Sequence, residues 1–227
     1  MTQPKPLVII GNGEIAAMAH QYFAFDSDYE VAAFAIGADY IKGETFEGRP
    51  LIPLDALASR YPPSTHDAFV AIGDSQLNRV RRRLFDHCSG AGYHLASYVS
   101  SRAFVWRDVA IGRNCFILEH NVLQPFVSIG DNVTLWSGNH IGHRSVVEDD
   151  VFMSSHVVIS GFCRIGARSF VGVNAALAPH VAVGPDNYIG MGAVIAQSTE
   201  PDSIYQGNPA ERRKVSATRF CRVPAKG

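Results

Sequence analysis

The sequence has no long apolar run, no excess of charge of either sign and few cysteines. No segment reaches the roughly 18 apolar residues that span a membrane, and there is no long apolar signal region near the N-terminus. The 20 Lys and Arg residues nearly balance the 21 Asp and Glu residues, so the overall charge attracts neither nucleic acid nor a membrane surface. The four cysteines lack metal-ligand spacing, and we expect them to be reduced packing residues. These absences predict a cytoplasmic protein without a nucleic-acid or membrane partner.

Between Val99 and Ile195 the sequence repeats every six residues. Each sixth residue, or anchor, is aliphatic: Val99, Val105, Ile111, Ile117, Leu123, Ile129, Leu135, Ile141, Val147, Met153, Ile159, Ile165, Val171, Leu177, Val183, Ile189 and Ile195. The fourth residue after each anchor is small, Asn or Val, and Gly directly follows several anchors. A helix would repeat every 3.6 residues and a half-buried strand every second residue, so this period indicates one short strand and one tight corner per hexad. Hexapeptide repeats are typical of parallel β-helices.

Residues 6–97 follow a different pattern. Leu7–Ile10 is a short buried-strand signal that leads through a glycine turn into a helical pattern, as in the opening of a βαβ unit. Further strands are predicted over 29–36, 66–74 and 93–99, and helices over 53–57 and 76–87. Together these elements predict a small parallel α/β domain.

A Rossmann-like domain followed by hexapeptide repeats resembles the sugar acyltransferases of the sialic acid O-acetyltransferase type, which include nucleotide-aminosugar N-acetyltransferases. The resemblance covers nearly the whole chain. It implies an α/β Rossmann-like domain over residues 1–97, an all-β left-handed parallel β-helix over residues 98–204 and a C-terminal cap or tail over residues 205–227. It also implies coils of three hexads, or 18 residues, and a homotrimer with acetyl-CoA in a groove between two β-helices.

The glycine turn at residues 11–13 has two interpretations. It is either a plain strand-to-helix connection, or a cradle in which the backbone approaches a phosphate at the helix N-terminus. The family resemblance implies the second, with the nucleotide of the sugar substrate bound by this domain and Asp39 reading the base. The implied substrate-binding residues are Gly11, Asn12, Gly13, Glu14, Asp39, Ile72, Gly73 and Asp74.

The stretch Ile141-Gly142-His143-x-x-Val146 resembles the family segment that carries the catalytic base, which makes His143 the candidate. An amine or hydroxyl must lose a proton as it attacks a thioester carbonyl, and an imidazole suits that task at neutral pH. The 18-residue coil stacks Gly161 on His143. The Gly161 N–H is then the candidate donor to the acyl oxyanion, and a plain corner glycine is the alternative.

Members of this family often place an acid directly after the base to orient it, but this chain has Arg144 there. A positive neighbour disfavours the charged imidazolium. The orienting partner of His143 must therefore lie elsewhere or be absent. The open candidates are Glu119, Glu148, Asp149 and Asp150.

Near the C-terminus, Gly207-Asn208-Pro209-Ala210 followed by basic residues closely resembles the end of the β-helix in many hexapeptide acyltransferases. Arg212, Arg213 and Lys214 are candidates to pair with the phosphates of coenzyme A. A solvated basic tail is the alternative for each of them singly.

The sequence thus favours an acetyl-CoA-dependent acetyltransferase that acts on the amino group of a nucleotide-linked aminosugar, by direct attack and without a metal, in bacterial surface glycan biosynthesis. Three alternatives stay open. The first is O-acetylation of a sugar hydroxyl. The second is a zinc enzyme of the β-helix carbonic anhydrase type, with His120, His140 and His143 as ligands. The third is a catalytically silent binding or assembly module.

Overall fold

The computed structural model describes residues 4–208 and 211–224, which form two compact units. The first unit contains residues 4–73 and 83–98. The second contains residues 74–82 together with the described residues from 99 onward. Residues 74–82 lie within the predicted N-terminal domain in sequence, but in space they group with the repeats.

The first unit is built on a five-stranded sheet in the order β3-β4-β2-β1-β5. Its elements are β1 (Lys5–Ile10), α1 (Glu14–Phe25), β2 (Tyr29–Ile36), the 3-10 turn η1 (Ala38–Tyr40), β3 (Thr45–Phe46), β4 (Arg49–Pro53), the 3-10 turn η2 (Leu54–Ala56), α2 (Leu57–Arg60), β5 (Asp67–Val70) and part of α3 (Arg79–Gly90). Strands β4, β2, β1 and β5 run parallel, and β3 is antiparallel to β4. The expected parallel α/β arrangement is confirmed.

Two parts of this unit differ from the prediction. The segment predicted as a strand over 93–99 forms an isolated bridge, Leu95 to Ala68, before β6 (Tyr98–Val99). Strands β3 and β4 were not predicted. Strand β4 contains Pro50 and Pro53, and proline weakens any strand signal because it cannot donate to the ladder.

A buried carboxylate joins the N-terminal ends of three parallel strands in this unit. Asp67 Oδ2 on β5 accepts hydrogen bonds from Lys5 Nζ of β1 (2.6 Å) and Tyr29 Oη of β2 (2.8 Å), and it lies 2.7 Å from His94 Nδ1. Burial alone would raise the pKa of Asp67, but these donors outweigh it and lower the pKa. Burial and the bond to Asp67 raise the pKa of Tyr29.

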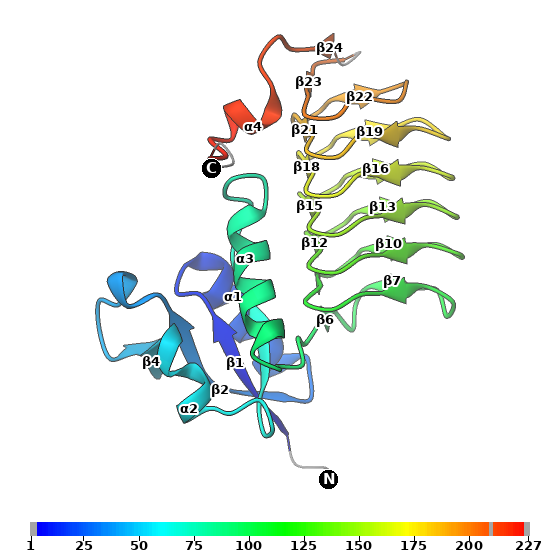
Figure 1. Ribbon diagram of the computed structural model, residues 1–227. Helices are drawn as coiled ribbons and strands as arrows, with labels where there is room; N and C mark the ends of the chain where they lie inside the picture. The colour runs from blue at the N-terminus through cyan, green and yellow to red at the C-terminus, as the bar shows by residue number, and fades with distance from the viewer. Residues whose placement is uncertain (1–3, 209–210, 225–227) are drawn as a thin grey trace. The chain divides into compact units, whose positions relative to one another are not determined.

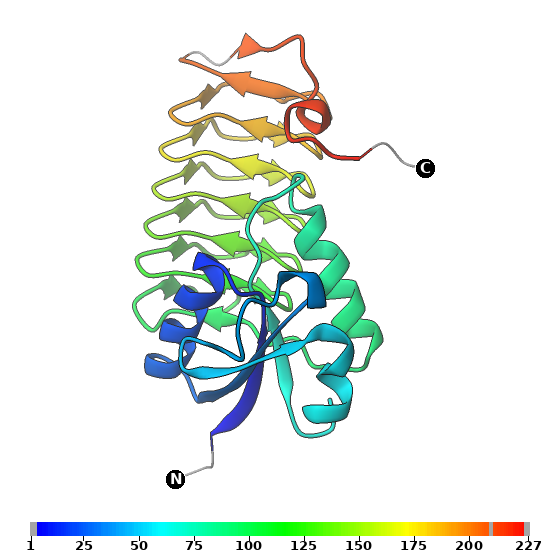
Figure 2. The same cartoon turned by 90° about the vertical axis from the view of Figure 1, so that its left-hand side faces the viewer.

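The second unit stacks seventeen two-residue strands into coils (Figures 1 and 2). They are β6 (Tyr98–Val99), β7 (Phe104–Val105), β8 (Ala110–Ile111), β9 (Phe116–Ile117), β10 (Val122–Leu123), β11 (Ser128–Ile129), β12 (Thr134–Leu135), β13 (His140–Ile141), β14 (Val146–Val147), β15 (Phe152–Met153), β16 (Val158–Ile159), β17 (Arg164–Ile165), β18 (Phe170–Val171), β19 (Ala176–Leu177), β20 (Ala182–Val183), β21 (Tyr188–Ile189) and β22 (Val194–Ile195). Strands β7 to β22 pair in parallel with a register of 18 residues, as in Leu135 with Met153. The strands and repeats fit a left-handed parallel β-helix.

These strands form three sheets, one for each side of the coil. We call them the β13 sheet (β22-β19-β16-β13-β10-β7), the β14 sheet (β20-β17-β14-β11-β8) and the β15 sheet (β24-β23-β21-β18-β15-β12-β9-β6). The last includes β23 (Ile204–Gln206) and β24 (Glu211–Arg212), which precede the short helix α4 (Ala217–Phe220). The described part of the predicted C-terminal cap thus extends one sheet of the repeats.

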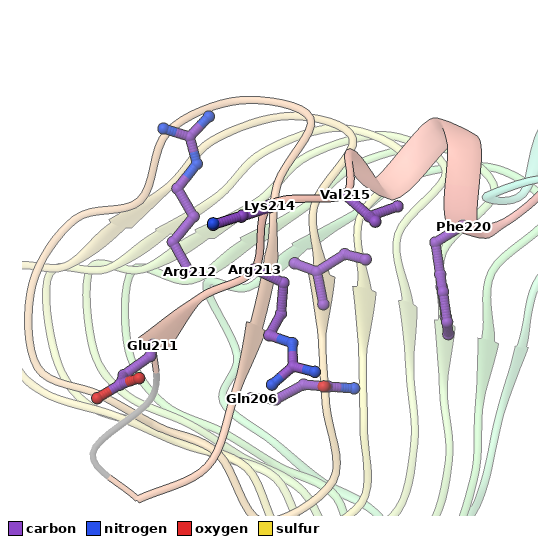
Figure 3. Close-up of a pocket in the computed structure, with 8 residues that line it drawn as sticks. Gln206, Glu211, Arg212, Arg213, Lys214, Val215 and Phe220 are labelled. Carbon is purple, nitrogen blue, oxygen red and sulfur yellow. The ribbon is translucent and has the colours of Figure 1, made fainter.

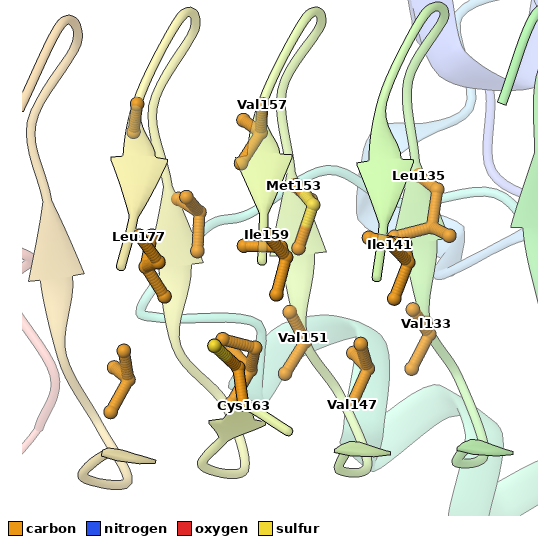
Figure 4. Close-up of a cluster of buried hydrophobic side chains, with 14 of the residues drawn as sticks. Val133, Leu135, Ile141, Val147, Val151, Met153, Val157, Ile159, Cys163 and Leu177 are labelled. Carbon is orange, nitrogen blue, oxygen red and sulfur yellow. The ribbon is translucent and has the colours of Figure 1, made fainter. Parts of the chain in front are cut away.

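The aliphatic anchors fill the interior of the coils (Figure 4). Each anchor is the second residue of its strand, and those from Ile117 to Ile195 are at most 2% exposed. The small residues four positions later also point inward, among them Cys115 and Cys163. Both cysteines and Cys88 are buried, as predicted, but Cys221 is only half-buried. Apolar burial along the whole stack explains why the period is preserved.

The corner of most hexads contains a left-handed residue three positions after the anchor. Examples are His120 (φ 60°), Arg144 (φ 58°) and Phe162 (φ 61°). Asparagine side chains satisfy the corner backbone within a coil and between coils. Asn121 Nδ2, for example, donates to Leu118 O (2.8 Å) and Trp136 O (2.9 Å). One strand and one left-handed corner therefore account for the six-residue period.

Residues 74–82, which we call the docking segment, lie along the β15 sheet. Arg81 is buried, and its Nη2 donates to Asn132 O (3.0 Å) and Asp150 O (3.3 Å). Arg79 Nη2 pairs with Asp186 Oδ1 at 2.7 Å, and Leu77 packs with Ile204 and Ala217. Burial lowers the pKa of Arg81 to about 10, although nearby Asp150 opposes this shift. The segment covers part of a sheet face that contains Phe152, Phe170 and Tyr188.

Candidate functional site

His143 lies at the exposed corner between β13 and β14. The stacked residue of the next coil is Gly161, as predicted. A Cβ atom on Gly161 would lie 2.6 Å from His143 Cε1 and 2.8 Å from Nε2. The absence of a side chain at this position is therefore what makes room for the imidazole.

The backbone N–H of Gly161 has no hydrogen-bond acceptor among the described residues. At equivalent corners, a side chain 19 residues earlier supplies one: Glu148 Oε2 accepts from Ala167 N (2.8 Å), and Gln124 Oε1 accepts from His143 N (2.8 Å). The residue 19 positions before Gly161 is Gly142, which has no side chain. This corner therefore presents a backbone donor beside the imidazole.

Within the described residues, none of the four candidate acids bonds to the His143 ring. Glu119 accepts from Ser137 Oγ (2.6 Å), Glu148 pairs with Arg164, and Asp150 accepts from Asn132 Nδ2 (2.7 Å). Asp149 Oδ1 accepts from Asp131 N (2.9 Å). The ring instead meets Gln124, whose Oε1 lies 3.2 Å from His143 Nδ1. Sequence reasoning missed Gln124, although it lies one coil before His143.

Arg144 points away from the imidazole because it occupies the left-handed corner position. Its guanidinium carbon lies 4.4 Å from the centroid of the Phe126 ring, one coil earlier. On the other side of His143, Phe162 meets the imidazole edge to face at 5.1 Å, and His180 stacks on Phe162 at 4.9 Å. Exposed aromatic and basic side chains thus flank the candidate base along one corner of the coils.

Arg212, Arg213 and Lys214 line a pocket of about 480 Å³ beside β23 and β24 (Figure 3). Ile204, Gln206, Glu211, Val215 and Phe220 complete its lining. The three basic residues are exposed. Pro209 and Ala210 of the motif that precedes them lie outside the described residues. The structure therefore brings the three predicted basic residues to one pocket.

In the first unit, the glycine turn meets two other segments at the C-terminal edge of the sheet. A Cβ on Gly11 would lie 2.7 Å from Ala71 O and 3.3 Å from Ile72 Cδ1, and Gly11 has φ 137°. Asn12 Nδ2 donates to Tyr40 O in η1 (3.2 Å). Close approach and a positive φ both require glycine at position 11.

The remaining predicted nucleotide-binding residues do not all belong to the same compact unit. Gly13 precedes α1 and has open space around its Cα, as does Gly73. Glu14, in the first turn of α1, and Asp39, in η1, are exposed. Asp74 belongs to the other compact unit. The first unit thus gathers residues 11–13, 38–40 and 71–73 at one edge of the sheet.

Two further findings concern metals and membranes. Within residues 4–208 and 211–224, no three His, Cys, Asp or Glu side chains are arranged to hold a metal ion, and this includes His120, His140 and His143. No helix in the described part of the chain has the length and apolar character needed to cross a bilayer.

Comparison with protein families identifies the repeats. The family model for bacterial transferase hexapeptide (six repeats) matches residues 108–143. Curated relatives include two acyl-[acyl-carrier-protein]–UDP-N-acetylglucosamine O-acyltransferases. That of Nautilia profundicola is 24% identical over 118 residues, 49% of this chain and 46% of the relative, and that of Burkholderia lata is 30% identical over 89 residues, 39% of this chain and 34% of the relative. The chain spans less than half the length of these relatives.

Solved structures match nearly the whole chain. The acetyltransferase domain of PglB from Neisseria gonorrhoeae, in complex with acetyl coenzyme A, is 26% identical with a TM-score of 0.82 over 92% of this chain and 99% of that domain. PerB from Caulobacter crescentus, in complex with CoA and GDP-perosamine, is 25% identical with a TM-score of 0.83 over 92% of this chain and 97% of that one. The resemblance of this chain to the hexapeptide-repeat sugar acyltransferases is therefore confirmed, in its repeats and in its fold.

Proposed function

We propose that this protein is an acetyl-CoA-dependent acetyltransferase that acetylates the amino group of a nucleotide-linked aminosugar. The observation that carries the proposal is that the His143 imidazole lies beside the backbone N–H of Gly161, which has no acceptor among the described residues. Support comes from PerB, which shares this fold and was solved with CoA and GDP-perosamine. Surface glycan biosynthesis in the bacterial cytoplasm is the proposed setting, and the free cysteines agree with that compartment.

In the proposed reaction, the substrate amine attacks the thioester carbonyl of acetyl-CoA directly. His143 Nε2 takes the proton that the amine loses, and this assistance is worth about 10²- to 10⁴-fold in rate. The carbonyl oxygen gains negative charge as the new C–N bond forms, and the Gly161 N–H donates to it. Cleavage of the C–S bond then releases CoA as the thiolate.

Arg212, Arg213 and Lys214 are the proposed binding residues for the phosphates of CoA. Their pocket adjoins β23 and β24, beyond the last complete coil. The proposal rests on their shared pocket and their charge, because cationic side chains pair with phosphates.

For the first unit, we propose a Rossmann-like nucleotide-sugar-binding domain. Gly11, Asn12, Gly13 and Glu14 would face the diphosphate at the start of α1, and Asp39 would read the base. Ile72 and Gly73 would line the same site, whereas the predicted Asp74 belongs to the other compact unit. The meeting of residues 11–13, 38–40 and 71–73 at one sheet edge supports this proposal.

We also propose a homotrimer. The β13 sheet and its adjoining corners leave several large apolar side chains exposed, and such patches on a folded protein mark interaction surfaces. They are Phe104, Trp106, Phe126, Val158 and Phe162. Because Phe126 and Phe162 flank the His143 corner, a second copy on this surface would enclose the reacting groups.

The test is release of CoA thiol from acetyl-CoA with UDP-, dTDP- and GDP-linked aminosugars. We expect one class of sugar to support turnover and His143→Ala to lower it at least about 100-fold. His156→Ala, which removes an exposed corner histidine elsewhere in the repeats, is the matched control. If no sugar reacts, or if His143→Ala keeps full activity, the proposed function or its base is wrong.

O-acetylation is the second candidate, because the curated relatives are named O-acyltransferases. Mild alkali distinguishes the two products: an ester loses its acetyl group and an amide keeps it. Mass measurement of the product before and after alkali therefore decides between hydroxyl and amine as the nucleophile.

A further inference from the structure

Gln124 makes two contacts with His143 through one atom. It directly follows β10, one coil before the histidine, and its Oε1 lies 2.8 Å from the His143 backbone N and 3.2 Å from the ring Nδ1. A backbone N–H can only donate, so the Gln124 atom beside it must be the amide oxygen. The same oxygen can only accept, so a hydrogen bond to it requires a hydrogen on Nδ1.

The repeat geometry fixes this arrangement. A side chain directly after a strand reaches the corner N–H of the next coil 19 residues later, as Glu148 also does for Ala167. The hydrogen bond from the His143 backbone N–H thus orients the Gln124 amide independently of the imidazole. The imidazole finds an acceptor at Nδ1 that is already oriented.

The acceptor is neutral. In the described structure Glu119, Glu148, Asp149 and Asp150 have the other partners given above, and the Arg144 guanidinium lies over Phe126. Compared with a carboxylate, an amide oxygen stabilises the imidazolium less and the neutral Nδ1–H form more selectively. That form leaves the lone pair on Nε2, which a Cβ on Gly161 would approach to 2.8 Å, against 3.0 Å for Nδ1.

We propose that Gln124 is a positioning residue that holds His143 in the Nδ1–H tautomer, so that Nε2 is the proton acceptor. The assignment of the tautomer rests on geometry alone, and its kinetic consequence rests on the proposed acetyltransferase function. Gln124 replaces, with a neutral side chain from the preceding coil, the acid that related enzymes often place next to the base.

The first test measures the tautomer directly, by long-range ¹H–¹⁵N correlation spectra of the histidine rings in the full-length protein. Signals of His143 are identified by their loss in His143→Asn. We expect a hydrogen on Nδ1 and a bare Nε2 in the wild type, and a mixture of tautomers in Gln124→Ala. Gln197→Ala is the matched control, because Gln197 is an exposed glutamine shortly after β22, four coils beyond β10 in the same sheet. A hydrogen on Nε2 in the wild type, or an unchanged spectrum in Gln124→Ala, overturns the proposal.

The second test is kinetic. We expect Gln124→Ala to lower kcat about 10- to 100-fold, as loss of an orienting partner does, with KM values changed less than about twofold. Gln124→Glu should restore most of kcat and move the acid limb of the pH profile to higher pH, because a carboxylate favours the imidazolium. Arg144, beside His143 in sequence, and His180, behind Phe162, are the other ionisable groups near the ring, and both variants leave them unchanged.

The two tests separate the proposals. Full kcat in Gln124→Ala contradicts the positioning role even if the wild type is an active acetyltransferase. If the wild type reacts with no aminosugar, the proposed function fails, and the ring spectra still decide whether Gln124 sets the tautomer.

Discussion

At the scale of single residues, the proposed site depends on two glycines, which have no side chain. Gly161 leaves room for the imidazole of His143, and Gly142 leaves the Gly161 N–H without an acceptor among the described residues. Both positions are ordinary corners of the hexad. The proposed function of this corner therefore depends on two glycines in an otherwise ordinary repeat.

Gly161→Ala tests this idea. Its Cβ would lie 2.6 Å from His143 Cε1, and because the obstacle is a side chain, the imidazole would have to rotate away while the fold persists. We expect kcat to fall about 100-fold, since displacement of a reacting group by about 1 Å has an effect of this size. Gly90→Ala, which has open space around its Cβ, is the control. Wild-type kcat in Gly161→Ala would show that the ring does not act from its present position.

Asp67 should make the first unit sensitive to acid. Its pKa is lowered in the folded protein, so its contribution to stability is complete above the unfolded pKa of about 3.9 and is lost as pH falls through the folded pKa. Asp67→Asn should therefore reduce the free energy of unfolding by about 1–3 kcal/mol at neutral pH.

The difference between wild type and Asp67→Asn should shrink as pH is lowered below about 4. Urea titrations at several pH values measure it. A difference that stays constant down to the acid limit would mean that the Asn variant loses packing and not the charge-assisted bonds to Lys5, Tyr29 and His94.

At the scale of elements, the docking segment is a part of the second unit that lies outside the hexad repeat. Arg81 is 1% exposed, and its guanidinium lies 5.8 Å from the centroid of Phe152. We expect Arg81→Met to lower the free energy of unfolding by about 1–3 kcal/mol, because buried carbonyls of the coils lose their donor.

Arg83→Met is the control for Arg81→Met. Arg83 lies on the same helix α3 but is exposed, and a surface change should stay within about 0.5 kcal/mol. Equal losses in the two variants, measured by urea unfolding, would mean that the buried guanidinium contributes no more to stability than the exposed one.

At the scale of the whole molecule, the proposed trimer depends on the β13 sheet. Val158 on β16 is 47% exposed in the single chain. We expect Val158→Glu to shift the protein from trimer to monomer in sedimentation equilibrium, because a carboxylate in an apolar interface is costly to desolvate. Phe25→Glu, which alters a highly exposed residue of the first unit, should leave the trimer intact. A monomeric wild type would refute the homotrimer.

The sequence by itself determined the repeating architecture. Each hexad contains an aliphatic anchor followed by a tight corner, and this pattern lies within six consecutive residues. The seventeen strands accordingly end on the predicted anchors. The 18-residue coil, known only through the family resemblance, was enough to bring His143 and Gly161 together.

Only the tertiary structure decided which side chains meet across coils and which segment covers them. Gln124 was not predicted as the partner of His143, because the directions of side chains from one coil to the next depend on left-handed corners that the sequence does not mark uniquely. Residues 74–82 were assigned to the N-terminal domain because helix α3 is continuous in sequence. Their grouping with the repeats depends on contacts such as Arg79 with Asp186, 107 residues apart. Local periodicity encodes a coil, whereas contacts between distant residues exist only once the coils are stacked.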